Sequence, residues 1–100
     1  MSDNAPPKGP KNPPNVQIQV PEDIAQGTYA NLTFVNHNET EFVLDFIFLQ
    51  PLEPRAKVRS RIISSPKHAK RFLNALRDNI ARYEDRFGEI DISRPGPAVH

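Results

Sequence analysis

Glu41-Phe42-Val43-Leu44-Asp45-Phe46-Ile47-Phe48-Leu49 is the most strand-like run of the chain, and it decides the fold. Aromatic and β-branched side chains favour the pleated, half-buried surface of a sheet. The polar, turn-forming residues 36–40 precede this run, and a second strand-like segment, residues 28–36, lies before the turn. The sequence therefore predicts a β-hairpin of residues 28–36 and 41–49.

Two more strands are predicted outside the hairpin. Residues 16–20 alternate strictly between apolar and polar side chains and are ended by Pro21. Residues 55–63 alternate in the same way after a loop bounded by Pro51 and Pro54, which cannot donate to a sheet ladder. Together with the hairpin, these segments predict four strands.

A long helix is predicted to follow the strands. Ser65 is suited to the N-cap, Pro66 to the first helical position, and Gly88 to the stop. Between them apolar side chains recur at steps of four and three, forming one stripe: Ala69, Leu73, Leu76, Ile80, Tyr83 and Phe87. The predicted fold class is α+β: a four-stranded antiparallel sheet followed by one long C-terminal helix packed on one face, in the order β-β-β-β-α.

The alternation also predicts which side chains share a face of the sheet. Pairing Phe34 with Phe42 would bring Leu32 beside Leu44 and place even-numbered residues on one apolar face under the helix. Further members of that face would be Ala30, Phe46, Ala56, Val58 and Ile62. On the reverse face the same register predicts Tyr29 beside Ile47, Thr33 beside Val43, Asn31 beside Asp45, and Asp45 beside Arg59 or Arg61.

The size of the chain bounds its organisation. Of 11 prolines in 100 residues, five lie in residues 1–15, which we interpret as a disordered tail, with a second tail over residues 92–100. Residues 16–91 are predicted to form a single domain, near the size at which one core is marginal. The helix is longer than the strands and narrower than the sheet, so a homodimer is expected to cover the remaining apolar surface. Alternatively, residues 16–21 and Ile24 fold over the gap.

Several classes of protein are excluded or disfavoured. The absence of cysteine removes disulfides, thiolate metal sites and cysteine nucleophiles. No signal peptide or membrane span is recognisable, so a cytoplasmic location is expected. The three histidines are not spaced as ligands, the four glycines are scattered, and Asp45 is better explained by a hydrogen-bonded row than by catalysis. We therefore predict no enzymatic activity, no metal and no cofactor.

Charge segregation is the most informative functional feature. Residues 13–54 hold six acids and no base, whereas residues 55–71 hold seven bases and no acid. Strand alternation would place Arg55, Lys57, Arg59 and Arg61 on one face with the ring of Tyr29, which is typical of a groove for single-stranded nucleic acid. The predicted nucleic-acid-binding residues are Tyr29, Arg55, Lys57, Arg59, Arg61 and Lys67. The alternative is a solvated face in which Glu41 and Asp45 pair with the arginines.

A second functional hypothesis uses the apolar residues of the sheet and the helix end. Those left uncovered by the helix could contact a second subunit or a client protein, as in a chaperone-like interaction module. The predicted dimer or client contacts are Val43, Ile47, Leu49, Tyr83 and Phe87.

Several stretches of the chain carry a resemblance to a known family: Tyr29-Ala30-Asn31-Leu32, Glu41-Phe42-Val43-Leu44-Asp45-Phe46, Ala56-Lys57-Val58-Arg59-Ser60-Arg61-Ile62, Ser65-Pro66-Lys67-His68-Ala69-Lys70-Arg71, and Asp78-Asn79-Ile80 to Phe87-Gly88-Glu89-Ile90. Over most of residues 16–90 the chain resembles a family of small bacterial proteins whose domain has no assigned function. The resemblance implies a bacterial origin and one compact domain, with both tails outside the family. The element order is also similar to that of the PUR, PC4-like and whirly single-strand binders and of the chaperone SecB, although order alone does not settle function.

Overall fold

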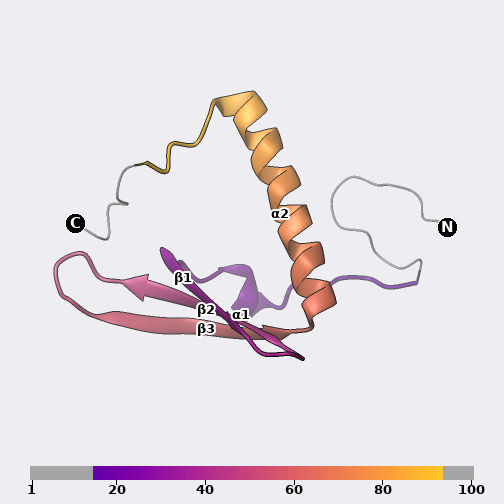
Figure 1. The fold of residues 1–100 in the computed structure, drawn as a ribbon, viewed down its shortest axis with the longest axis horizontal. Coiled ribbons are helices and arrows are strands. Elements are labelled where there is room, and N and C mark those ends of the chain that lie inside the picture. The colour runs from indigo at the N-terminus through magenta and orange to yellow at the C-terminus, as the bar shows by residue number, and fades with distance from the viewer. Residues whose placement is uncertain (1–14, 94–100) are drawn as a thin grey trace.

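The structure, a computed structural model, describes residues 15–93 (Figure 1). Its elements follow in the order α1 (Glu22–Ala25), β1 (Leu32–His37), β2 (Phe42–Leu49), β3 (Ala56–Ser64) and α2 (Pro66–Phe87). The strands form one antiparallel sheet in the order β1-β2-β3. This confirms an α+β fold with a C-terminal helix. The predicted disordered tails, residues 1–15 and 92–100, fall almost entirely outside the described residues.

The sheet has three strands within the described residues, so the prediction of a fourth at residues 16–20 is wrong. Val16, Ile18 and Val20 are all exposed, and no neighbouring strand pairs with them. Alternating apolar and polar residues give a segment one apolar side, but a strand also needs the edge of a neighbouring strand with which to form backbone hydrogen bonds. Instead, the chain next forms the single turn of α1, which begins after Pro21 and carries Glu22 and Asp23 in its first turn. That proline and those two acids were the available signal for α1.

The predicted bounds of α2 are confirmed at both ends. The Ser65 hydroxyl oxygen accepts a hydrogen bond from the backbone N–H of His68 at 3.1 Å, and Pro66 opens the helix. At the other end, Gly88 has φ +100°, a backbone conformation that favours glycine, and its N–H donates to the Glu84 carbonyl at 2.9 Å. Local sequence signals therefore define this helix completely.

The register of the β1–β2 hairpin differs from the predicted one by three residues. Leu32 pairs with Ile47 and Phe34 with Asp45, rather than with Leu44 and Phe42. The cause is the loop: the Asn38 side-chain oxygen accepts hydrogen bonds from the backbone N–H groups of Thr40 and Glu41, which makes a four-residue connection, residues 38–41. Because the shift is odd, the side chains of β1 exchange faces, and Val35 lies beside Leu44.

A β-bulge on β3 changes the predicted faces a second time. Phe46 pairs with Ser60 but Ile47 pairs with Val58, which leaves Arg59 as the extra residue. Before the bulge, Lys57 lies beside Phe48, whereas after it Arg61 lies beside Asp45. Ala56 and Val58 therefore lie on the face opposite the one predicted, while Ile62 stays beside Leu44 as expected.

These pairings define two faces of the sheet. The helix-side face carries Phe42, Leu44, Phe46 and Phe48 of β2 with their cross-strand neighbours, and the reverse face carries Val43, Asp45, Ile47 and Leu49 with theirs. Ile47 is the one buried apolar residue among those described, at 3% exposure, and Asp45 is the one buried polar residue, at 7%. The small core therefore lies on the central strand, on the reverse face.

The expected packing of α2 on the sheet is not observed. The helix starts at the end of β3 and projects away from the strands (Figure 1). Only Ser65 separates Ser64, the last residue of β3, from Pro66, the first of α2, and the helix leaves the sheet directly at the end of that strand. The apolar stripe of the helix consequently remains exposed to solvent.

Candidate nucleic-acid interface

Three of the predicted cations gather at the loop that joins β2 to β3. Arg55, Lys57 and Arg59, which we call the cationic cluster, line one depression of about 320 Å³ together with Phe48, Gln50 and Ala56. The loop is held by the backbone N–H of Gln50, which donates to the Arg55 carbonyl at 3.1 Å. The bulge at Arg59 keeps this residue next to Lys57 on the wall of the depression.

Tyr29 lies at the same end of the sheet. Its ring contacts the ring of Phe48 edge-on, with centroids 6.2 Å apart and an angle of 71° between the planes. Phe48 and Lys57 are cross-strand partners, so the two rings adjoin the cationic cluster on the helix-side face. Tyr29 is 71% exposed, which leaves one face of an aromatic ring open to a ligand.

Asn31 explains how Tyr29 is positioned. The Asn31 side-chain amide donates to the Leu49 carbonyl at 3.1 Å, and its oxygen accepts from the Leu49 N–H at 2.9 Å. The Asn31 backbone N–H also donates to the Ile47 carbonyl. These bonds hold the chain before β1 against the end of β2. The predicted neighbours of Asn31 and Tyr29, Asp45 and Ile47, are therefore both wrong.

Arg61 lies on the reverse face, so the prediction that it shares a face with Lys57 is also wrong. The Arg61 Nε and Nη2 atoms donate to the two carboxylate oxygens of Asp45 at 2.7 and 2.9 Å. These hydrogen bonds and the charge of the guanidinium lower the pKa of Asp45, and the carboxylate raises the pKa of Arg61. The expected pairing of Asp45 with Arg59 or Arg61 is confirmed for Arg61, which is thereby removed from the interface.

Lys67 is separated from the cationic cluster. It belongs to the first turn of α2, which follows Ser64, the partner of Phe42. The cluster lies beside Phe48, six residues further along β2, or about 20 Å at strand rise. Lys67 therefore lies at the opposite end of the sheet.

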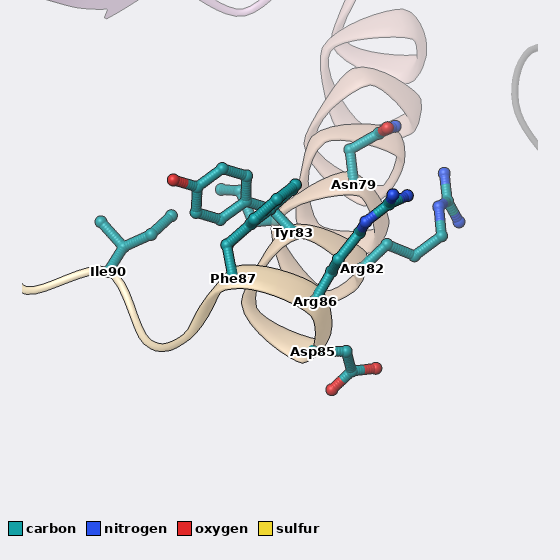
Figure 2. A pocket seen from close by; sticks show the side chains of 8 residues that line it. Asn79, Arg82, Tyr83, Asp85, Arg86, Phe87 and Ile90 are labelled. Carbon is teal, nitrogen blue, oxygen red and sulfur yellow. The ribbon is translucent and has the colours of Figure 1, made fainter.

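The predicted dimer or client contacts separate into two groups. Val43, Ile47 and Leu49 lie on the reverse face, where Ile47 is buried and the other two are half-buried. Tyr83 and Phe87 are exposed near the end of α2, with ring centroids 4.9 Å apart (Figure 2). Of the five predicted contacts, Tyr83 and Phe87 are the most exposed, whereas the exposed apolar side chains of the reverse face are Phe34, Val58 and Ile63.

Sequence reasoning missed Phe48 and Gln50 as parts of the interface. Both line the depression beside the cations. Phe48 could have been found from its even-numbered position near the end of the strand, but its association with Lys57 depends on the bulge. In residues 15–93 no group of three or more histidine or acidic side chains is placed to hold a metal ion. Among the same residues, no helix is long and apolar enough to span a membrane.

The comparisons with known proteins identify a family without an assigned activity. No curated protein and no solved structure matches the chain. A family model described as "Protein of unknown function (DUF3467)" matches residues 1–92, so the N-terminal segment that was expected to lie outside the family lies within it. The chain is therefore a member of the DUF3467 family of proteins of unknown function.

Proposed function

We propose that this protein is a non-enzymatic binding protein that holds single-stranded nucleic acid against Tyr29, Phe48 and the cationic cluster. The observation that supports the proposal most directly is one depression lined by Arg55, Lys57, Arg59 and Phe48, with the exposed ring of Tyr29 in contact with Phe48. Cations that track phosphates and a ring that stacks on a base are the two elements of sequence-tolerant single-strand binding.

The charge of this surface favours an anionic ligand. Arg55 has one acidic neighbour, with its Nε atom 3.6 Å from a carboxylate oxygen of Glu53, and both side chains are largely exposed. An exposed pair of this kind contributes at most about 1 kcal/mol and can exchange for a phosphate contact. With Glu53 counted against three cations, the surface retains a net positive charge.

Salt dependence tests the electrostatic part of the proposal. Three phosphate contacts to a single strand predict a slope of log affinity against log salt of about −2.1, from about −0.7 per contact. Fluorescence anisotropy with a labelled oligonucleotide at several salt concentrations measures this slope. In Lys57→Glu/Arg59→Glu the affinity should fall strongly. The slope should become shallower, to between about −0.7 and zero, because at most one phosphate contact remains.

Lys67→Glu/Arg71→Glu is the matched control, because it reverses two charges in the first turns of α2, at the other end of the sheet. It should retain most of the affinity and the slope of the parent. If both double variants weaken binding equally, the protein attracts nucleic acid only through its overall charge. If the cluster variant binds like the parent, the proposed interface is wrong.

Tyr29→Leu tests stacking separately from charge. Loss of one base stack costs about 1–3 kcal/mol, or roughly a fivefold to 150-fold loss of affinity. The salt slope should stay unchanged, because no cation is removed. An unchanged affinity would show that the ring takes no part in binding.

Client binding through the sheet receives less support from the geometry. Ile47 is the most buried apolar residue described, so it is inaccessible to a client chain in this structure. Apolar binding would also give a salt slope near zero or a stronger interaction at high salt, the opposite of the trend predicted above. The same titration, repeated with an unfolded protein as ligand, separates the two functions.

A further inference from the structure

The apolar stripe of α2 is the largest feature that the proposed nucleic-acid interface leaves unexplained. Its large side chains are 40–65% exposed: Phe72, Leu73, Leu76, Ile80, Tyr83 and Phe87. A helix in water gains most of its stability from burying such a face. The stripe therefore requires a cover that a single chain does not provide within the described residues.

The first half of α2 borders an apolar groove. Phe72, Leu73 and Leu76 face the sheet residues Val35, Phe42 and Leu44 across a cavity of about 500 Å³, whose only charged lining residue is Lys70. The second half of the helix extends beyond the sheet (Figure 1). Figure 2 shows the rings of Tyr83 and Phe87 side by side near its end, with Ile90 close to Tyr83. The first half of α2 thus forms one wall of the groove, and the apolar side of its second half is exposed to solvent.

We propose that a second copy of this chain covers the stripe, and that the two α2 helices pair antiparallel about a two-fold axis near Asp78. The second half of each helix would then lie along the first half of the other, at the groove. Leu76 would face Ile80 of the other copy, Leu73 would face Tyr83, and the small Ala69 would face the large Phe87. Each contact occurs twice, so the assembly closes as a dimer.

The distribution of charge along α2 favours the antiparallel direction. Residues 66–77 carry four bases and no acid, whereas residues 78–87 carry three acids and two bases, and Glu89 and Asp91 follow directly after the helix. An antiparallel pair therefore brings the basic half of each helix to the acidic half of the other, while a parallel pair opposes like charges. Charge complementarity of this kind selects orientation and partner more than it adds affinity.

The available area is consistent with a stable dimer. A fully exposed aromatic side chain presents about 150–250 Å², so the six half-exposed residues of the stripe offer roughly 500 Å² per copy. A standard interface buries about 800 Å² per partner. Val35 and Ile90, which are also exposed, and the polar side chains that flank the stripe can supply the difference. The dimer lies beyond the nucleic-acid proposal and does not depend on it.

Sedimentation equilibrium of the full chain tests the number of subunits. The expected mass is twice the 11.3 kDa of one chain at micromolar concentration. Tyr83→Glu should weaken the dimer at least tenfold, because two copies of the new charge would be buried. Asn74→Glu, which adds the same charge on the side of the helix away from the stripe, is the matched control and should remain dimeric. A monomeric parent protein overturns the proposal, even if its stripe binds another protein.

Cysteine pairing tests the direction of the helices and does not depend on how Tyr83→Glu folds. The chain has no cysteine, so single cysteines can be placed without background. When Leu73→Cys and Tyr83→Cys chains are mixed and oxidised, antiparallel helices give the mixed 73–83 disulfide. Two copies of residue 73 would lie about 15 Å apart, beyond disulfide reach. Self-linked 73–73 and 83–83 products would show parallel helices and overturn the proposed arrangement.

Discussion

Asp45 is the residue whose chemistry depends most on a single partner. Its side chain is 10% exposed and receives two hydrogen bonds from Arg61. Because the pair lowers the pKa of Asp45 in the folded protein, its contribution to stability is complete above the ordinary carboxyl value of 3.8. That contribution is lost as the pH falls through the lower, folded-state pKa.

Urea denaturation between pH 7 and pH 2.5 measures this contribution. We expect Asp45→Asn to lose less stability than the parent over the acid range, because one carboxylate with a lowered pKa is gone. Arg61→Leu should be more destabilising at pH 7 than Asp45→Asn, since it leaves a buried carboxylate without its partner. Glu39→Gln, in the exposed β1–β2 loop, is the control for removing a carboxylate. An acid dependence that is the same in all variants would contradict the assignment.

Among the elements, α2 depends on a cap that can be removed cleanly. The Ser65 hydroxyl oxygen satisfies the His68 N–H, one of the donors that has no partner inside the helix. Ser65→Ala should therefore lower the free energy of unfolding by about 1 kcal/mol, as measured by urea denaturation. Ser65→Asp keeps an acceptor and should restore the stability. If alanine and aspartate behave alike, the hydroxyl contributes nothing to the helix.

The sequence was sufficient for α2 and insufficient for the sheet register, for a physical reason. The signals for α2, Ser65, Pro66 and Gly88, act within one turn of the chain. The hairpin register depends instead on how many residues Asn38 draws into its loop, and the face of Lys57 depends on a bulge at Arg59. A change of one residue at either place exchanges every side chain beyond it between faces.

The candidate interface reflects the same distinction. The bases of residues 55–61 are visible in the sequence as a cluster, and Arg55, Lys57 and Arg59 do line one depression. The separation of Arg61 from them, however, follows from the bulge and from its hydrogen bonds to Asp45. Phe48 lines the depression because it pairs across the strands with Lys57. The composition therefore identified the basic segment of the sequence, and the pairing between strands determines which side chains line the depression.

At the scale of the whole molecule, a single chain buries very few of its apolar side chains. Ile47 is the one buried apolar side chain among residues 15–93, although the sequence has an apolar stripe and an apolar strand. The sequence predicted that one helix would cover the sheet only in part, whereas in the structure the apolar stripe of the helix is itself exposed. The short link at Ser65 was visible in the sequence, but the direction in which α2 leaves the sheet was not, so the helix was expected to pack over the strands.

Thermal unfolding at different protein concentrations provides a test of folding coupled to association. If dimerisation supplies most of the core, unfolding includes dissociation and the midpoint rises with concentration. A tenfold increase is worth about 1.4 kcal/mol, or roughly 3–6 °C for two chains of this size. Tyr83→Glu should unfold at a lower temperature, with a midpoint that does not change with concentration. A parent midpoint that stays constant over a hundredfold range would mean that one chain, with its exposed stripe, folds independently.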